Sequence, residues 1–337
     1  MNAGPRPQNV AIVGATGLVG ETLLRILDER RFPVAALRCY ATARSAGATV
    51  RACGVDATVE RLEDVSEPFS GVDVAFFAGG DAVSRRYARG AAAAGALVVD
   101  KSTVYRLDPS VPLVVPEVNA GSIGAHQLIA NPNCSTIPLA VALAPIERAF
   151  GLSWVSVSTY QSVSGAGKDA VEELAAQSAG SSVRAALPRR IAGNVVPEVG
   201  PFGDDGYVEE EQKIAAELQK ILALPELRVS ATTVRVPVVV GHSESVSFAP
   251  KKPAPIDEIR ALLKSATGVR FLEGNAYATP LEAAGSDEVF VGRLRADHAH
   301  PGAYLCWIVC DNLRKGAATN AVQIVEAALR ERARVPA

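Results

Sequence analysis

Short apolar runs alternate with amphipathic stretches in the N-terminal part of the chain. The runs have lengths typical of buried strands and lie at residues 9–13, 36–41, 73–78 and 97–100. The stretches, in which leucine, isoleucine or alanine recur at helical spacing, predict helices at residues 21–31 and 84–94. Strands that alternate with helices form right-handed crossovers and a parallel sheet. This part of the chain therefore predicts an α/β domain built on a parallel sheet.

The pattern changes after Pro132. Alternating or β-branched runs predict the strands of a larger mixed sheet at residues 154–160, 229–240 and 243–247. Amphipathic stretches predict helices at residues 168–178, 209–223 and 317–332. Residues 181–206, rich in glycine, proline and arginine, predict an exposed excursion. We therefore expect a second domain of α+β type.

The amino-acid composition argues against a nucleic-acid-binding, a disordered or a membrane-spanning protein. The chain has 337 residues, with 34 Lys plus Arg against 36 Asp plus Glu, for a formal charge of −2. Proteins that bind nucleic acid usually carry a basic surplus, so we expect no nucleic-acid partner. Hydrophobic residues make up 48% of the chain, enough for a sizeable core and unlike a disordered protein. The longest apolar stretch, residues 136–146, is shorter than the roughly 20 residues that span a bilayer, so we expect no membrane segment.

The N-terminus and the cysteines favour the cytoplasm. Residues 1–8 lack the basic start and uninterrupted apolar run of a signal peptide. The five cysteines are an odd number without disulfide spacing, which predicts free thiols in a reducing compartment. Cys306 and Cys310 lie in an apolar segment without nearby ligand residues, so buried strand positions are favoured over a metal site. We expect a cytoplasmic protein without a bound metal.

A glycine-rich turn directly follows the first predicted strand. Gly14, Gly17 and Gly20 recur at every third position, and the first predicted helix begins just after them. Glycines let the backbone approach a pyrophosphate, and a helix N-terminus offers N–H donors and the positive end of its dipole. Strand, turn and helix together predict a Rossmann-type dinucleotide-binding domain. The alternative is an ordinary Gly-rich turn without a ligand.

The end of the second predicted strand favours NADP over NAD. Domains that bind NAD usually place an acidic residue there to accept from the ribose 2′-OH. Residues 41–47 contain no acid, whereas Thr42, Arg44 and Ser45 offer hydroxyls and a guanidinium. Arginine pairs bidentately with a phosphate, which suits the 2′-phosphate of NADP. The alternative is that Arg44 is a solvated loop charge.

Cys134 is the candidate nucleophile. It lies in a polar turn, residues 131–136, that opens a predicted helix, and a helix N-terminus stabilises a thiolate. A cysteine nucleophile needs a general acid/base, for which histidine is the usual choice. Of the four histidines, His242 follows a predicted strand, and the other three lie in polar loops. We therefore expect Cys134 and His242 to form a catalytic pair.

A series of motifs runs in order along nearly the whole chain. They lie at residues 14–20, 42–47, 111–119, 131–136, 161–167, 209–213, 235–238, 241–244 and 311–321. Together they resemble the aspartate-β-semialdehyde dehydrogenase family. The resemblance implies that NADPH reductively dephosphorylates L-aspartyl 4-phosphate through a thioester on Cys134, giving aspartate semialdehyde and phosphate for amino-acid biosynthesis. It also implies a homodimer built through the sheet of the second domain.

The resemblance assigns roles to individual side chains. His242 is expected to act as the acid/base, and Gln161 to orient the substrate beside the thiol. Each charged group of the substrate is expected to bind a side chain of opposite charge. Its carboxylate is expected to bind Arg235, and its ammonium is expected to bind Glu210. Its phosphate is expected to bind Lys213 and Arg106. The cofactor is expected to contact Gly14, Thr16, Gly17, Leu18, Val19, Thr42, Arg44, Ser45, Ser164, Gly165 and Asn320.

The residues alone support some of these roles better than others. Glu210 and Lys213 are three positions apart, so both can project from one helix face, although they also read as a surface ion pair. Arg106 reads equally as a loop arginine. Arg235 lies within a β-branched run, where a buried cation is costly unless an anion meets it.

The resemblance also implies a domain organisation. Residues 1–131 are expected to form the NADP-binding domain, completed by the C-terminal helix within residues 311–337. Residues 132–310 are expected to form the catalytic and dimerisation domain. Lys101 departs from the family, which has asparagine there, and is expected to alter the surroundings of the phosphate or the thiol.

Two alternatives remain open at this point. One is an activity like that of N-acetyl-γ-glutamyl-phosphate reductase, whose acylated substrate would not need Glu210 as an ammonium partner. The other is a non-catalytic NADP-binding paralogue that keeps the fold.

Overall fold

A computed structural model describes residues 6–333 of the chain. The chain divides into two compact units: unit 1 comprises Met1–Pro132 and Ala317–Ala337, and unit 2 comprises Asn133–Gly316. The first five and last four residues of unit 1 lie outside the described residues. Within the described range, no helix combines the length and the apolar character needed to cross a bilayer.

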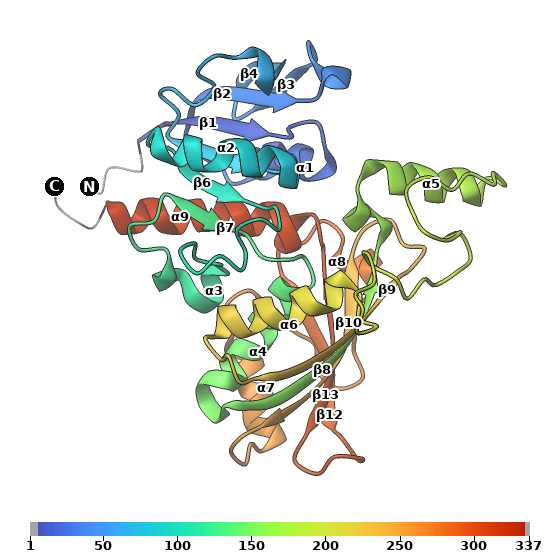
Figure 1. Ribbon diagram of the computed structural model, residues 1–337. Helices are drawn as coiled ribbons and strands as arrows, with labels where there is room; N and C mark the ends of the chain where they lie inside the picture. The colour runs from blue at the N-terminus through green and yellow to red at the C-terminus, as the bar shows by residue number, and fades with distance from the viewer. Residues whose placement is uncertain (1–5, 334–337) are drawn as a thin grey trace. The chain divides into compact units, whose positions relative to one another are not determined.

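Unit 1 is built on a seven-stranded sheet of order β3-β4-β2-β1-β5-β6-β7 (Figure 1). The strands are β1 (Gln8–Val13), β2 (Val34–Ala41), β3 (Thr49–Ala52), β4 (Val55–Arg61), β5 (Val74–Phe77), β6 (Leu97–Asp100) and β7 (Leu128–Ala130). All neighbouring strands are parallel except β3 and β4, which are antiparallel. The four predicted N-terminal strands are confirmed. Their apolar runs lack alternation because helices cover a parallel sheet on both faces.

The helices of unit 1 come from both ends of the chain. They are α1 (Leu18–Glu29), α2 (Asp81–Ala93), the short α3 (Pro116–Asn119) and α9 (Thr319–Arg332). Figure 1 shows α9 beside β6, although the two are far apart in sequence. Ile324 and Val325 of α9 join the same apolar core as Ile26 and Leu27 of α1, and all four are essentially inaccessible to solvent. This shared core places the last helix in unit 1.

Unit 2 contains a six-stranded mixed sheet of order β11-β12-β13-β10-β8-β9. The strands are β8 (Leu152–Gln161), β9 (Arg228–Arg235), β10 (His242–Pro250), β11 (Val269–Phe271), β12 (Val289–Ala296) and β13 (Tyr304–Cys310). The pairs β8–β9 and β11–β12 are parallel, and the other neighbours are antiparallel. The expected mixed sheet is confirmed, and with unit 1 it confirms the predicted fold class, a parallel Rossmann-type sheet followed by an α+β domain.

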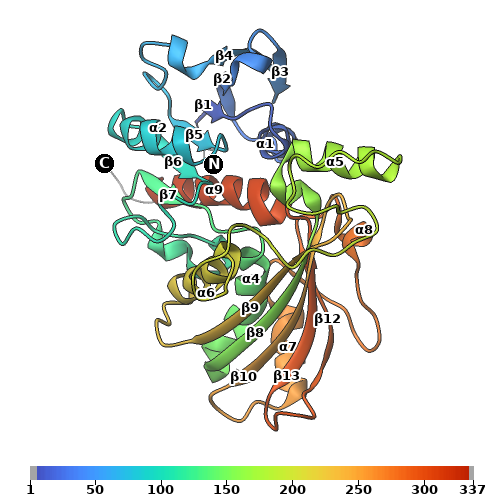
Figure 2. The same cartoon turned by 45° about the vertical axis from the view of Figure 1, so that its right-hand side comes forward.

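The longer helices of unit 2 are α4 (Thr136–Phe150), α5 (Lys168–Ser178), α6 (Glu209–Leu222) and α7 (Ile256–Ser265), with the short α8 (Pro280–Ala283) near β13. Three of them, α4, α6 and α7, pack on this sheet, whereas α5 packs against the turn at Val163–Ala166 (Figure 2). Helix α6 lies alongside β9, and α4 contacts α6, α7 and β13. The buried faces of α4 and α6 thereby fix where their N-terminal ends lie against the sheet.

Two predictions about unit 2 need correction. The predicted strand 229–240 ends at Arg235, because Pro237 has no N–H to donate to a neighbouring strand. The predicted excursion 181–206 is exposed only in part, since Ile191 and Val196 are buried. Val196 exchanges two backbone hydrogen bonds of 2.8 and 2.9 Å with Arg235, which fasten the excursion to the end of β9.

Candidate active site

The glycine turn of unit 1 leaves room for a phosphate group. Gly14 has φ +87°, and a Cβ there would lie 2.7 Å from the Ala78 backbone. A Cβ at Gly20 would lie 2.2 Å from the Gly14 oxygen, so neither position tolerates a side chain. A Cβ at Gly17 would meet only the Gly14 oxygen at 3.5 Å, so the space beside Gly17 is open. This geometry fits a dinucleotide pyrophosphate at the N-terminus of α1.

The predicted NADP-selecting residues lie beside this turn. The Thr16 hydroxyl donates to Ser45 Oγ at 3.0 Å, which ties the glycine turn to the loop after β2. Thr42 and Arg44 are exposed in that loop. Leu18 and Val19 begin α1, whose N-cap residue, Gly17, has no side chain to cap the first N–H groups. The turn and the loop therefore form one continuous polar surface.

In unit 2, Cys134 and His242 lie within contact distance. Cys134 precedes the N-terminus of α4, and its Sγ lies 3.3 Å from Nε2 of His242. His242 is the first residue of β10 and is 1% exposed, whereas Cys134 is partly exposed. The structure therefore brings together the two residues expected to form a catalytic pair.

Two glycines make room for this pair. A Cβ at Gly165 would lie 3.2 Å from His242 Nε2 and 2.9 Å from Arg235 Nη1. A Cβ at Gly316 would lie 3.2 Å from the Cβ of Cys134. All three distances are tighter than most side-chain contacts, so these positions set how closely the backbone approaches the pair.

The register of the six-stranded sheet explains why the polar residues converge. Gln161 ends β8 and Arg235 ends β9, and the two are paired because these strands are parallel. His242 begins β10, which runs antiparallel to β8, so it lies at the same edge of the sheet. Cys310 ends β13 directly opposite His242. One sheet edge thus collects residues that are far apart in sequence.

Cys134 differs from the other thiols in its surroundings. All five cysteines are free. Burial raises the pKa of Cys39 and of Cys306 to about 12, and it raises the pKa of Cys310 as well. Cys306 and Cys310 lie in β13, which confirms their predicted placement in a buried strand. Burial makes those thiols poor nucleophiles, whereas Cys134 lies beside an imidazole.

Gln161 and Glu210 form a polar cluster beside the turn that holds Cys134. Nε2 of Gln161 donates to Oε1 of Glu210 at 3.2 Å and to Ser135 Oγ at 2.5 Å. Asn133 donates to the same Glu210 oxygen at 2.8 Å. The Oε1 atom of Gln161 is buried and has no hydrogen-bond partner among the described residues. A ligand donor, such as an ammonium, would satisfy it.

Arg235 is a buried cation within reach of anionic groups. It is 7% exposed, and its Nη1 donates to the Ser162 carbonyl at 2.8 Å. Desolvation lowers the pKa of its guanidinium, while the nearby Cys134 and Glu210 act in the opposite direction. A buried cation such as Arg235 needs an anion nearby, and Cys134 and Glu210 meet part of that need.

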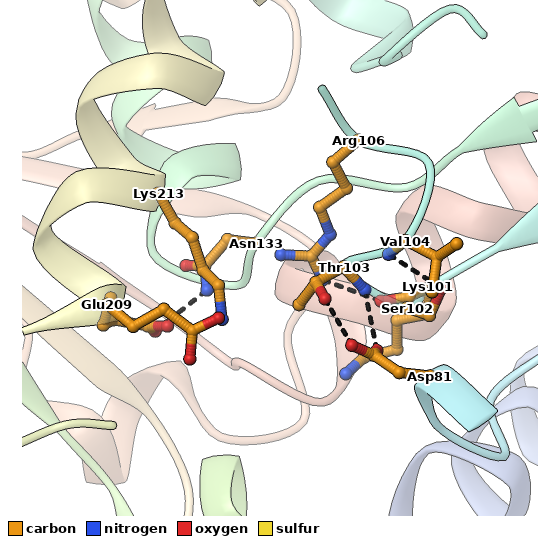
Figure 3. Close-up of polar contacts among 10 residues, drawn as sticks. Asp81, Lys101, Ser102, Thr103, Val104, Arg106, Asn133, Glu209 and Lys213 are labelled. Atoms are coloured by element: carbon orange, nitrogen blue, oxygen red, sulfur yellow. Dashed lines mark hydrogen bonds and ion pairs between the residues drawn. The ribbon is translucent and has the colours of Figure 1, made fainter. Parts of the chain in front are cut away.

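Lys213 and Glu210 take different partners. Lys213 Nζ forms an ion pair of 2.8 Å with Glu209, one turn earlier on α6 (Figure 3). Glu210 instead points to Asn133, on the turn before α4. The sequence spacing allows an ion pair between Glu210 and Lys213, but Lys213 pairs instead with Glu209, four positions earlier on the helix.

Arg106 lies in unit 1, in the loop that follows β6. It is 6% exposed and donates to the Lys101 carbonyl at 2.7 Å. The same loop is fastened to α2, because Asp81 accepts from the backbone N–H of Thr103 at 3.0 Å and from its hydroxyl (Figure 3). Lys101 and Arg106 therefore sit on one constrained loop.

The remaining predicted cofactor residues are divided between the units. Ser164 and Gly165 lie in a short 3₁₀ turn of unit 2, residues Val163–Ala166. Asn320 lies at the start of α9 in unit 1, where it donates to the Val114 carbonyl at 3.0 Å and to Asn131 Oδ1 at 2.8 Å.

Three polar residues of the site received no role in the sequence analysis, although each lies within one of its motifs. Ser162 contacts the ring of His242, Asn312 contacts Ser162, and Asn133 contacts Glu210. Ser162 and Asn133 stand next to predicted residues, and that adjacency was the available signal. Asn312 is 70 positions beyond His242, and only the β10–β13 register brings them together.

Comparison with known proteins gives full-length similarity. Residues 143–315 match the family model described as semialdehyde dehydrogenase, dimerisation domain, and residues 9–126 match semialdehyde dehydrogenase, NAD binding domain. Aspartate-semialdehyde dehydrogenase of Legionella pneumophila is 47% identical over 97% of this chain and 97% of its own length. The enzyme of that name from Aquifex aeolicus is 46% identical over 96% of this chain and 98% of its own length.

The structural comparison agrees. The crystal structure of aspartate semialdehyde dehydrogenase II from Vibrio cholerae, complexed with ASA, matches with a TM-score of 0.94 and 43% sequence identity. The match covers 97% of this chain and 99% of the other.

Replacing Gly165 by alanine tests the close approach at this site. A methyl group would press on His242 Nε2 and Arg235 Nη1, at 3.2 and 2.9 Å. We expect the rate at which iodoacetamide alkylates Cys134 at neutral pH to fall about tenfold, the equivalent of one pKa unit. Mass spectrometry of the Cys134 peptide measures this rate. Gly90→Ala is the control, because nothing lies within 4 Å of its added Cβ; an unchanged rate in Gly165→Ala would contradict the prediction.

Proposed function

This chain belongs to the aspartate-semialdehyde dehydrogenase family, and from that premise we propose that it converts L-aspartyl 4-phosphate and NADPH to L-aspartate 4-semialdehyde, phosphate and NADP. The reaction is reversible. The observation that carries the proposal is the 3.3 Å contact between Cys134 Sγ and His242 Nε2. The relatives do not favour the acetylglutamyl-phosphate alternative, since those at 41–47% identity bear the aspartate-semialdehyde name.

In the proposed mechanism Cys134 is the nucleophile. Its S–H proton passes to His242 Nε2, so that the thiolate attacks the acyl carbon of the substrate. A C–S bond forms, and the bond to the phosphate oxygen breaks, with the electron pair leaving on phosphate. The product of this half-reaction is a thioester on Cys134.

The second half-reaction releases the aldehyde. NADPH, when held by the glycine turn of unit 1, would supply the hydride for the thioester carbon. His242, held 3.3 Å from the sulfur, donates a hydrogen bond from Nε2 to the oxyanion that develops there. Collapse of this intermediate breaks the C–S bond, restores the Cys134 thiolate and leaves the aldehyde.

Charged side chains would hold the substrate in this orientation. We assign the carboxylate to the Arg235 guanidinium, whose planar fork suits a bidentate pair. We assign the ammonium to Glu210. Gln161 Oε1, which has no hydrogen-bond partner within residues 6–333, would be a further acceptor. Lys213 and Arg106 would neutralise the departing phosphate.

Unit 1 would hold NADP. We assign the pyrophosphate to the open space beside Gly17 and the first N–H groups of α1. Arg44, with Thr42 and Ser45, would pair with the 2′-phosphate. The loop contains no acidic residue that would bind the ribose 2′-OH of NAD and repel this phosphate. We assign the nicotinamide side to Ser164, Gly165 and Asn320.

Unit 2 would carry both catalysis and dimerisation. The matched dimerisation model spans residues 143–315, and we propose a homodimer built through the six-stranded sheet. On one face of that sheet, Tyr160 remains 38% exposed and its ring lies 5.5 Å from that of Trp307. A reducing compartment such as the cytoplasm suits a mechanism that depends on a free thiol.

The first test removes the nucleophile. Cys134→Ala should abolish phosphate-dependent reduction of NADP by aspartate semialdehyde, because losing a nucleophile costs several orders of magnitude. NADPH binding, followed by nucleotide fluorescence, should stay nearly unchanged. Cys53→Ala is the control, since Cys53 is a partly exposed thiol of unit 1. Turnover above roughly a hundredth of wild type in Cys134→Ala would rule out the covalent mechanism.

The second test concerns the choice of cofactor. Arg44→Ala should weaken NADPH binding about ten- to hundredfold, the loss expected for one charge-assisted contact. NADH binding should change little, because NADH has no 2′-phosphate. Titration of both nucleotides measures the effect, with Arg51→Ala as the control, an exposed arginine paired with Asp56 at 3.7 Å. Equal losses for both nucleotides would show that Arg44 does not discriminate.

The third test concerns the substrate. Glu210→Gln keeps the shape and removes the charge, so kcat/KM for aspartate semialdehyde should fall about ten- to hundredfold. NADPH affinity and alkylation of Cys134 should change little. Glu258→Gln makes the same chemical change at an exposed site and should have no effect. Intact kcat/KM in Glu210→Gln, or a wild-type preference for N-acetyl-γ-glutamyl phosphate, would overturn the substrate assignment but leave the Cys134 mechanism standing.

A further inference from the structure

Glu217 is a buried carboxylate of α6 to which the mechanism above assigns no role. It is 1% exposed and belongs to the buried part of a helix that contacts both α4 and β9. Its Oε2 accepts from the backbone N–H of Asn133 at 2.6 Å. A buried carboxylate is costly unless it is hydrogen-bonded, and this short contact meets part of that need. The residue that Glu217 holds directly precedes Cys134.

Asn133 organises the turn that carries Cys134. Its Oδ1 accepts from the backbone N–H of Ser135 at 2.8 Å, which closes a turn across Cys134. Its carbonyl accepts from the backbone N–H of Ile137 at 3.0 Å, which joins the turn to α4. Neither contact involves the backbone N–H of Asn133, and Glu217 is the group that binds it. The orientation of the turn at its first residue is therefore set from α6.

Two glutamates of α6 hold Asn133. Glu210 Oε1 accepts from its side-chain Nδ2 at 2.8 Å, and Glu217 accepts from its backbone. The glutamates are seven positions apart, close to two helical turns, so they lie on one face of α6. Glu210 is partly exposed and is assigned to the substrate, whereas Glu217 is enclosed by protein. One helix thus serves the substrate and the nucleophile with different carboxylates.

The other end of the turn is held by the edge of the six-stranded sheet. Gln161 Nε2, at the end of β8, donates to Ser135 Oγ at 2.5 Å. Cys134 therefore lies between one residue held by α6 and one held by β8. With both ends held, the thiol stays 3.3 Å from His242 Nε2. Loss of the contact at either end would let the thiol move away from the imidazole.

We propose that Glu217 is a positioning residue, whose hydrogen bond to the backbone of Asn133 holds Cys134 within reach of the His242 ring. It acts through the turn and makes no use of the substrate. The inference rests on the proposed function in one respect, the role of Cys134 as the nucleophile. It adds a determinant of thiol reactivity that lies outside the sheet edge.

The charged and titratable groups near the nucleophile come from several elements. His242 of β10 contacts the thiol, and Arg235 of β9 and Cys310 of β13 are linked to it electrostatically. Glu210 of α6 is linked in turn to Arg235. A substitution of Glu217 leaves these groups in place, but it can act through the charge of the carboxylate or through its reach. Two variants separate these effects.

Glu217→Asp keeps the charge and removes the reach. The loss of one methylene withdraws the carboxylate by roughly 1.5 Å, from 2.6 Å to beyond the usual limit of an N–H···O hydrogen bond. The midpoint of the pH dependence of Cys134 alkylation by iodoacetamide should rise by about one pH unit, because the thiolate loses the imidazole beside it. Mass spectrometry of the full-length protein, without substrate or cofactor, measures the midpoint, with the Cys53 peptide as internal control.

Glu217→Gln keeps the reach and removes the charge. Its Oε1 can still accept from Asn133, and the loss of a negative charge does not disfavour a thiolate, so the midpoint should not rise. A purely electrostatic role predicts the reverse, an unchanged midpoint in Glu217→Asp and a lower one in Glu217→Gln.

Glu211→Gln is the matched control on the same helix. Glu211 accepts from the backbone N–H groups of Thr233 at 2.9 Å and Val208 at 3.0 Å. Glutamine can accept only one of these hydrogen bonds with its single oxygen, so Tm should fall while the midpoint stays in place. An unchanged midpoint in Glu217→Asp, a rise of equal size in Glu217→Gln, or a rise in Glu211→Gln overturns the proposal.

A measurement on the wild-type protein keeps the test independent of variant folding. The backbone N–H of Asn133 should exchange slowly with deuterium in an NMR experiment, because it is buried and hydrogen-bonded. Fast exchange at that amide would overturn the proposal. None of these readouts requires turnover, so a wrong substrate assignment would leave them intact. Retained turnover in Cys134→Ala would instead overturn the proposed function and leave the effect of Glu217 on the thiol measurable.

Discussion

The register of the six-stranded sheet is the constraint on which the site depends. Parallel pairing of β8 with β9 places Gln161 beside Arg235, and antiparallel pairing of β8 with β10 brings His242 to the same edge. A shift of one residue in either register would turn these side chains to the opposite face of the sheet. The buried hydrophobic residues of these strands hold the register, and the register fixes the positions of Gln161, Arg235 and His242. Catalytic geometry and core formation are specified by the same alternation.

Glycine determines how closely the elements around this edge approach one another. A Cβ at Gly165 or Gly316 would crowd His242 or Cys134, and a Cβ at Gly20 would overlap the backbone of the first turn of unit 1. Each exclusion is steric and acts in the absence of any ligand. Close backbone approach at these glycines lets Cys134 Sγ and His242 Nε2 lie 3.3 Å apart in the absence of a ligand. Such an arrangement would be the preorganisation that the proposed catalysis requires.

The sequence predicted those parts of the molecule whose cause is local. The strand–turn–helix at residues 14–20 and the buried strands follow from short motifs and periodicity. Cys134 and His242, which are far apart in sequence, were paired only by their residue types and by the family resemblance. The end of β9 at Arg235 was missed, because a β-branched run hides the effect of Pro237 on strand pairing. The Lys213–Glu209 pair was missed because several glutamates on α6 compete for one lysine. Ser162 and Asn312 depend on contacts between distant strands, which no local pattern encodes.

The charges around Cys134 also bear on which acyl phosphate the site prefers. Glu210, which is partly exposed, and the buried Arg235 carry opposite charges near Cys134. Each is already oriented, Glu210 by Asn133 and Gln161 and Arg235 by the Ser162 carbonyl. A substrate with an ammonium and a carboxylate matches both charges. A substrate with an acylated nitrogen would leave Glu210 without a cation while burying it further, and an unpaired buried carboxylate is costly. Selectivity then arises from a penalty against the wrong substrate as much as from attraction of the right one. If the proposed roles hold, Glu210 of α6, which Gln161 at the end of β8 orients, would impose this discrimination.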